Sequence, residues 1–402
     1  MARIALRAQA VSPSLTLAIT AQAKRMKVEG KAVVSFGAGE PDFNTPDYIC
    51  KAAKDALDMG LTKYTPAAGT EALRAAVADK LKADNHLLYA PEDIVISNGA
   101  KHALFNAFSA ILDEGDEVII PAPYWLTYPE LVKLCGGVNE FVRTKAEKGF
   151  KLTAAELEKA ITPKTKAGLI NNPCNPTGAV YSEKELKALA RVLEKHEEIF
   201  IISDEIYEKL IYDLPPCYSI AEYSPQIKAR TILVNGVSKT YAMTGWRIGY
   251  TASDRAVAKA IAGMQSHTTS NPNAIAQYAA LGAYTGSEGE AFLAQMRQTF
   301  DTRRKYMIET LEGMQPLTYI RPEGAFYMMV GVEKLFGKQT PRGVKIESAY
   351  SFATALLSEC EVAVIPCEPF GADGYVRLSY AISLEDIKEG LSRIKAFADS
   401  LR

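Results

Sequence analysis

A lysine among small and hydroxyl residues is the first candidate for chemistry in this sequence. Lys239 lies in the segment 236–249, GVSKTYAMTGWRIG, which follows an apolar, β-branched run at 231–235. Such a run predicts a buried strand. A lysine held at its end can lose its proton because burial disfavours the ammonium, and the amine can then form a Schiff base with a carbonyl. Arg247 follows among small residues, a setting in which its guanidinium could bind a phosphate. On this segment alone, a surface lysine and a structural arginine are nearly as good an interpretation.

Polar residues also follow other predicted strands. Asp204 and Tyr207 come after the apolar run 199–203, and the carboxyl ends of parallel strands are where ligand crevices form in α/β proteins. The segment 171–178, NNPCNPTG, follows another strand, although its composition alone predicts only a turn. The segment 97–101, SNGAK, joins a strand to a helix, and backbone N–H groups at such a helix start can bind phosphate.

Taken in order, these segments resemble those of class I aminotransferases, which use pyridoxal 5′-phosphate (PLP). Ser-Lys followed by Gly-x-Arg-x-Gly is similar to the PLP attachment segment, and the segments 172–178 and 204–207 match two further family motifs. The resemblance runs from about Pro13 to Leu401 and is strongest to bacterial aspartate and aspartate/prephenate aminotransferases. In one departure, some family members have a phosphate-binding serine where this chain has Gly236.

The resemblance implies a role for each matching residue at the cofactor. Lys239 would carry PLP and act as general acid and base. Asp204 would pair with the protonated pyridine nitrogen, Tyr207 and Asn175 would hydrogen-bond the phenolate oxygen, and Trp125 would stack on the ring. The phosphate would be bound by Gly99, Ala100, Lys101, Ser238 and Arg247.

The same resemblance implies a substrate site and a partner. Arg377 would bind the substrate α-carboxylate in a bidentate fork, and Lys101 would bind the distal carboxylate of a dicarboxylic acid. The other substrate-binding positions would be Gly39, Trp125, Asn175 and Phe326, with the segment 12–16 near the far end of the substrate. Tyr64 would reach across a homodimer to the phosphate of the other subunit.

The elements that must position these residues alternate along the chain. Strands are predicted at 93–97, 117–121, 166–171, 199–203, 231–235 and 248–252, with helices between most of them. This alternation predicts an α/β layered sheet. The resemblance implies the PLP-dependent transferase fold (fold type I): a mostly parallel seven-stranded sheet between helices. We expect a large domain at 46–300 and a smaller α+β domain formed by 1–45 and 301–402.

Composition limits the functional classes. The chain has 46 Lys+Arg against 47 Asp+Glu, so no overall field favours nucleic acid or an anionic membrane. Its 6 cysteines form no CxxC pair and it has only 4 histidines, which argues against a metal site and a secreted disulfide framework. The start lacks the apolar core of a signal peptide, and no run reaches membrane-spanning length. We therefore expect a cytoplasmic protein.

The predicted reaction is transamination of L-aspartate with 2-oxoglutarate, and three alternatives remain. Prephenate or another aromatic substrate would fit the same family, since the acidic preference depends mainly on Lys101. A carbon–sulfur lyase would share the cofactor machinery on the same fold. A PLP-sensing regulatory domain would need an attached DNA-binding module, which neither the length before Pro13 nor the balanced charge favours.

Overall fold

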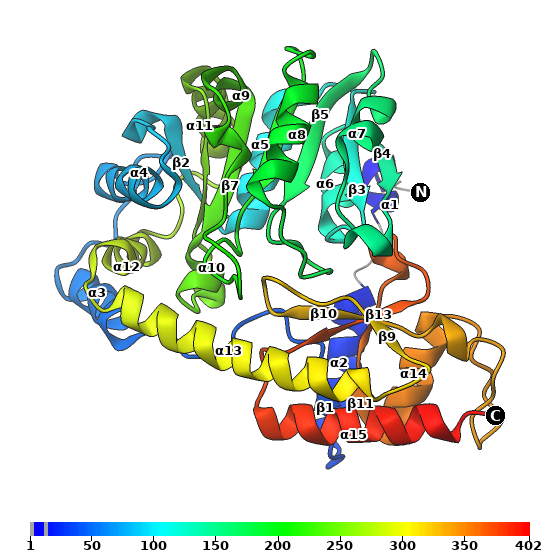
Figure 1. Ribbon diagram of the computed structural model, residues 1–402. Coiled ribbons are helices and arrows are strands. Elements are labelled where there is room, and N and C mark those ends of the chain that lie inside the picture. Colours follow the sequence, from blue (N-terminus) through cyan, green and yellow to red (C-terminus); the bar gives the residue numbers. More distant parts are fainter. Residues whose placement is uncertain (1–3, 12–14) are drawn as a thin grey trace.

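A computed structural model describes residues 4–11 and 15–402 of the chain (Figure 1). At its centre is a seven-stranded sheet in the order β2-β8-β7-β6-β5-β3-β4. The strands are β2 (Ile94–Ser97), β3 (Glu117–Ala122), β4 (Val138–Arg143), β5 (Thr165–Asn171), β6 (Phe200–Asp204), β7 (Thr231–Gly236) and β8 (Gly249–Ala252). Neighbouring strands are parallel except that β8 is antiparallel to both β2 and β7. The predicted mostly parallel sheet is confirmed.

Helices cover both faces of this sheet (Figure 1). They are α3 (Asp47–Asp58), α4 (Glu71–Asn85), α5 (Ala100–Ile111), α6 (Thr127–Leu134), α7 (Ala154–Ala160), α8 (Glu183–Leu193), α9 (Pro225–Arg230), α10 (Val237–Thr240), α11 (Arg255–Thr268) and α12 (Ala274–Thr285). Because side chains alternate along a strand, Val95 packs in the cluster with α5, α6 and α11, whereas Ile94 and Ile96 pack with α3, α4 and α12. Burial on both faces explains the continuous apolar runs of the central strands.

The smaller domain contains a four-stranded antiparallel sheet in the order β12-β13-β10-β9. Its strands are β9 (Thr318–Tyr319), β10 (Tyr327–Gly331), β12 (Ile365–Pro366) and β13 (Tyr375–Ser379). A separate parallel pair joins β1 (Val34–Ser35) to β11 (Val362–Ala363). The helices α1 (Leu6–Gln9) and α2 (Leu15–Val28) precede β1, and α13 (Gly289–Glu312), α14 (Ala349–Cys360) and α15 (Leu384–Ser400) complete the chain.

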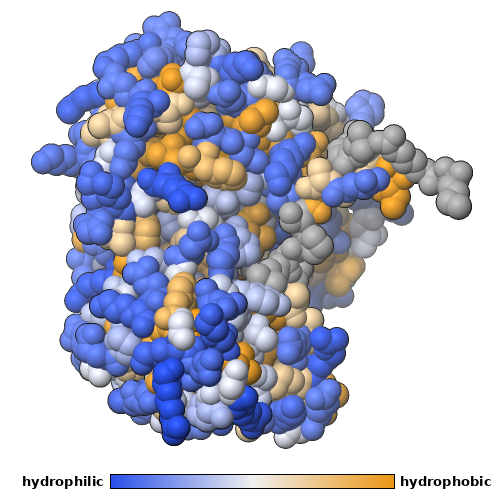
Figure 2. Space-filling view, turned by 90° about the vertical axis from the view of Figure 1, so that its right-hand side faces the viewer, coloured by the Kyte–Doolittle hydropathy of each residue, from blue (hydrophilic) through white to orange (hydrophobic). Residues whose placement is uncertain are grey.

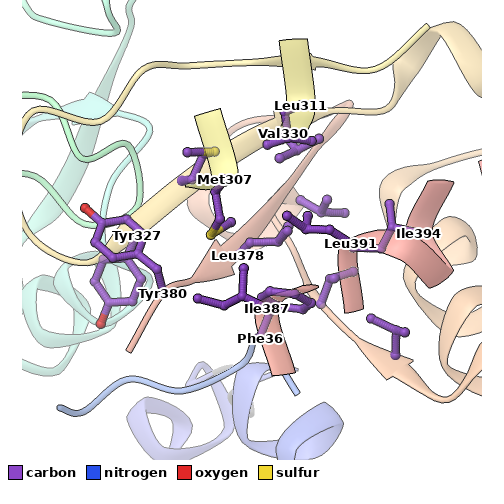
Figure 3. Close-up of a cluster of buried hydrophobic side chains, with 14 of the residues drawn as sticks. Phe36, Met307, Leu311, Tyr327, Val330, Leu378, Tyr380, Ile387, Leu391 and Ile394 are labelled. Carbon is purple, nitrogen blue, oxygen red and sulfur yellow. The ribbon is translucent and has the colours of Figure 1, made fainter. Parts of the chain in front are cut away.

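One core joins the small sheet to its helices (Figure 3). Met307 and Leu311 of α13, Leu378 of β13 and Leu391 of α15 pack in a single buried cluster, together with Phe36 beyond β1. The helix α13 begins beside α12 near the large sheet and ends in this core (Figure 1). The predicted boundary at residue 300 falls inside this helix, and the division into two domains stays a prediction.

Several elements were not predicted from the sequence. The edge strand β4 is partly exposed along its length, and Val138 and Phe141 are exposed, so it lacks the continuous apolar pattern of the central strands. The face toward β4 carries hydrophobic side chains in small groups among hydrophilic ones (Figure 2). Residues 362–366 form two short strands, β11 and β12, which lie in different sheets. No helix among the described residues is long and apolar enough to span a membrane.

Candidate active site

A cavity of about 470 Å³ contains most of the residues predicted for the site. Its walls come from the large sheet, through Asn171 and Asp204 at the ends of β5 and β6, and from the small domain, through Tyr327 and Arg377. The predicted residues in its lining are Gly39, Ala100, Lys101, Trp125, Asn175, Asp204, Tyr207, Ser238, Lys239, Arg247 and Arg377. Positions 12–14 of the predicted segment 12–16 lie outside the described residues.

Lys239 lies on the short helix α10, directly after β7. Its Nζ donates a hydrogen bond to the carbonyl oxygen of Gly39 at 2.6 Å. Burial lowers the pKa of Lys239 to about 8, with the Glu40 carboxylate opposing that shift and Arg247 reinforcing it. A substantial fraction of the side chain is therefore a neutral amine at slightly alkaline pH, as a nucleophile or a proton acceptor requires.

Asp204 is a carboxylate with 3% exposure at the end of β6. Its Oδ2 accepts a hydrogen bond from the Tyr128 hydroxyl at 2.7 Å, and its Oδ1 accepts one from the backbone N–H of Ile206 at 3.2 Å. Burial raises the pKa of Asp204 to about 6, although the bond from Tyr128 opposes the shift. A cationic group in the cavity would stabilise the ionised form.

Positive groups gather at another part of the cavity wall. Arg247 has φ +56° after the 3-10 turn η4 (Thr244–Trp246), and its guanidinium donates to the carbonyl of Thr244 at 2.9 Å. Gly99, at φ +84°, precedes α5, and a Cβ there would lie 2.3 Å from Nη2 of Arg247. Only glycine therefore allows the guanidinium to approach the start of α5, where free N–H groups also point outward. Lys101 lies in the same region, and its pKa is lowered by burial and by Arg247.

Arg377 and Asn175 form a buried polar pair on the small-domain side. Arg377 has 3% exposure, and its Nη1 donates to Oδ1 of Asn175 at 2.8 Å. The guanidinium lies 4.3 Å from the ring centre of Tyr327. Its Nε is buried without a hydrogen-bond partner within the described structure. A buried donor without a partner is costly, so this side chain is suited to an anionic ligand.

The turn that carries Asn175 is held by its own side chains. The backbone N–H of Asn175 donates to Oδ1 of Asn171 at 2.9 Å, and Oδ1 of Asn172 accepts from the N–H of Tyr181 at 2.9 Å. The turn contains the cis bonds Asn172–Pro173 and Asn175–Pro176. Asn171 and Asn175 both line the cavity, a position that the composition of the turn alone did not predict.

Three predicted site residues are not in the cavity wall. Gly99 lies behind the Arg247 guanidinium. Phe326 is fully buried and packs edge-on against Tyr207, with ring centres 5.5 Å apart. Tyr64 is 91% exposed on the single chain. Roles for these residues stay predictions.

Sequence reasoning missed several residues of the cavity wall. Tyr327 is the first residue of β10, directly after Phe326, and it lines the cavity; its hydroxyl lies 3.0 Å from that of Tyr207. Tyr128 is three residues after Trp125, and its backbone N–H donates to the Trp125 carbonyl in the turn that leads into α6; the two rings pack edge-on, with their centres 5.4 Å apart. Glu40 accepts a hydrogen bond from Thr244 at 2.6 Å. None of the sequence motifs described above included Tyr128 or Glu40 as a site residue.

The donor set in the cavity fits PLP. It combines an amine of lowered pKa, a buried carboxylate, a guanidinium beside a helix start and the half-buried ring of Trp125, with the Lys101 ammonium 5.0 Å from the centre of that ring. These groups match an aldehyde, a pyridine nitrogen, a phosphate and an aromatic ring respectively. Among the residues that the structure describes, no cluster of three or more His, Cys, Asp or Glu could hold a metal ion.

Comparison with known proteins gives consistent results along the chain. Residues 31–394 match the family described as aminotransferase class I and II. The chain is 47% identical over 394 residues to a protein of Bacillus sp. (strain YM-2) named aspartate aminotransferase, covering 98% of both. It is 45% identical to an aspartate/prephenate aminotransferase of Cereibacter sphaeroides, covering 97% of both. A structure of Thermus thermophilus aspartate aminotransferase with maleate matches with a TM-score of 0.93 and 42% identity, covering 99% of this chain and 100% of that chain.

Proposed function

The chain belongs to the class I and II aminotransferase family, and we propose that it transfers the amino group of L-aspartate to 2-oxoglutarate with PLP as cofactor. The observation that carries this proposal is the shared cavity of Lys239, Asp204 and Arg377. It combines an amine of lowered pKa, a buried acid and a buried guanidinium with an unpartnered N–H. Those three groups suit the cofactor aldehyde, the cofactor ring nitrogen and the substrate carboxylate.

The proposed cofactor contacts come from the family resemblance, and all of these residues except Gly99 line the cavity. Lys239 would anchor it, Asp204 would face its ring nitrogen, Asn175 and Tyr207 its phenolate oxygen, and Trp125 its ring. The phosphate would be bound by Gly99, Ala100, Lys101, Ser238 and Arg247. When bound, PLP supplies an electron-withdrawing ring that stabilises the charge left at the substrate Cα after proton removal.

The reaction itself requires proton movement by this chain. We assign that role to Nζ of Lys239, which would take the proton from the substrate Cα. The lowered pKa favours this role, because a general base is most effective with a pKa near the working pH. Arg377 would bind the substrate α-carboxylate and so hold the Cα–H bond toward Nζ. Its bond to Asn175 fixes the guanidinium for this purpose.

The dicarboxylate preference rests on Lys101 and on the relatives. Lys101 is a cation in the cavity wall that would bind the distal carboxylate. The Bacillus relative is named for aspartate, and the Thermus enzyme is described with maleate, a dicarboxylate. The Cereibacter relative is named for both aspartate and prephenate, so prephenate is the second candidate substrate.

We also propose a homodimer in which Tyr64 reaches the phosphate site of the other subunit. The near-complete exposure of this large aromatic side chain on the single chain supports the proposal. The amino acid and oxo acid substrates are small molecules, and no nucleic acid partner is proposed. The cytoplasmic location stays a prediction.

Three measurements test the proposed function. The purified protein should be yellow, its absorption should shift when aspartate is added, and 2-oxoglutarate should reverse the shift. Replacing Lys239 with alanine should abolish exchange of the α-proton of aspartate with solvent. Near wild-type exchange in that variant would show that another residue moves the proton.

The wild type should have a higher specificity constant for aspartate than for alanine, which lacks a distal carboxylate. Equal constants would show that Lys101 does not bind that carboxylate.

A further inference from the structure

Tyr128 provides the side-chain hydrogen bond to Asp204. It lies in the first turn of α6 with 1% exposure, and its hydroxyl is 2.7 Å from Oδ2 of the carboxylate. Its ring is also fixed, since it packs edge-on against Trp125 at an interplanar angle of 87°. The tyrosine thus contacts both the acid and the aromatic residue assigned to the cofactor ring.

The direction of this hydrogen bond is settled by chemistry. Burial and the negative charge of Asp204 raise the pKa of Tyr128 well above its usual value, so the phenol stays protonated and must donate. Among the residues that the structure describes, the other donor to the carboxylate of Asp204 is the N–H of Ile206, at the longer distance of 3.2 Å and on the other oxygen. Each carboxylate oxygen therefore keeps a free lone pair for a group in the cavity.

Other ionisable groups near Asp204 cannot replace Tyr128. Lys239 acts on Asp204 only through its charge, not through a hydrogen bond. Tyr207 and Cys174 also interact with Asp204, and burial raises the pKa of both, so they are neutral. Removing the Tyr128 hydroxyl would leave a buried carboxylate with one long backbone hydrogen bond, and burial favours the neutral acid.

We propose that Tyr128 is a positioning residue that holds Asp204 in its ionised form and orients its free lone pairs toward the cofactor ring nitrogen. This inference rests on the proposed function, because it assumes that Asp204 faces that nitrogen. Tyr128 itself need not touch the reacting atoms. Its effect on the cofactor passes through Asp204.

The experiment compares Tyr128→Phe with Tyr181→Phe. Tyr181 is another buried tyrosine, whose hydroxyl accepts the backbone N–H of Leu152 at 2.7 Å. The dissociation constant of PLP is measured by equilibrium dialysis between pH 5.5 and 8.5 for both variants and the wild type. A hydrogen bond to a charged group is strong enough that we expect about 10-fold weaker PLP binding in Tyr128→Phe at pH 7. The pH below which binding weakens should also move upward.

A double-mutant cycle separates positioning from packing. If Tyr128 acts through the charge of Asp204, then Tyr128→Phe should have little further effect on PLP binding in an Asp204→Asn background. Equal losses from Tyr128→Phe and Tyr181→Phe, an unchanged pH profile, or additive losses in the double variant would each overturn the inference. A result in which Asp204→Asn binds PLP as well as the wild type would instead overturn the assignment of Asp204 in the proposed function.

Discussion

Replacing Glu205 with glutamine should make the stability of the protein less sensitive to pH. Glu205 follows Asp204 in the chain and has 1% exposure. Its Oε1 accepts hydrogen bonds from Ser203 at 2.7 Å and Ser219 at 2.6 Å, whereas Oε2 has no partner among the described residues. Burial, reinforced by the charge of Glu208, raises the pKa of Glu205 to about 8. Glutamine keeps the oxygen that accepts from both serines.

The sign and size of the effect follow from proton linkage. Between pH 4.5 and about 8, the folded protein keeps a proton on Glu205 that the unfolded chain releases. The free energy of unfolding therefore falls as pH rises through this window. At about 1.4 kcal/mol per pKa unit, the loss approaches about 5 kcal/mol in the limit of the full shift. Glutamine has no proton to lose, so the variant should not show this part of the decline.

The assay is urea unfolding of the PLP-saturated protein at pH 5, 6, 7 and 8. The stability difference between Glu205→Gln and the wild type should move in favour of the variant as pH rises, by a few kcal/mol. Glu347→Gln is the matched control, because Glu347 is an exposed glutamate paired with Lys345 at 2.9 Å. If the unfolding free energies of Glu205→Gln and the wild type fall in parallel from pH 5 to pH 8, the folded protein does not hold a proton on Glu205.

Three other substitutions have expected outcomes. Arg377→Lys should lower kcat/KM for aspartate by about 10- to 100-fold, because an ammonium cannot form the bidentate contact with the α-carboxylate; steady-state kinetics would contradict this if the constant were unchanged. Lys101→Gln should lower kcat/KM about 10-fold for aspartate but less for tyrosine, and equal losses for both would remove its role at the distal carboxylate. Arg304→Met should destabilise the protein by about 1 to 3 kcal/mol in urea unfolding, because it removes the hydrogen bonds that this buried guanidinium donates to Asp301, Asp213 and the carbonyl of Pro322; an unchanged midpoint would contradict it.

The sequence predicted those site residues that lie in contiguous motifs. Lys239 and Asp204 each follow an apolar strand, so their places at the end of the sheet could be inferred from local pattern and from the resemblance. Their lining of one cavity agrees with that inference. Tyr128 could not be assigned in this way, because its proposed role depends on a hydrogen bond from α6 to Asp204 at the end of β6, which is distant in the sequence. A local sequence pattern cannot predict a contact between two segments that are distant in the sequence.

In the fold too, elements set by local sequence were predicted, whereas elements set by pairing with distant segments were not. The central strands were predictable because burial on both faces requires continuous apolar runs. The strand β1 was not, since its two residues are held by pairing with β11 rather than by any intrinsic pattern. Tyr327 was missed for a related reason: Phe326 was predicted for the site, but the cavity is lined by the next residue, Tyr327, at the start of β10.

The pairing of β1 with β11 has a consequence for how the chain folds during synthesis. Val34 leaves the ribosome before every strand of the large sheet, whereas its partner Val362 leaves after all of them. Phe36 likewise cannot complete its packing until Leu391 of α15 has been synthesised, because both belong to the same buried cluster. The large sheet, whose strands all lie between these segments, can form first. The loop that carries Gly39 follows β1, so we expect the wall of the cavity beside Lys239 to form only after the strands of the large sheet have been synthesised.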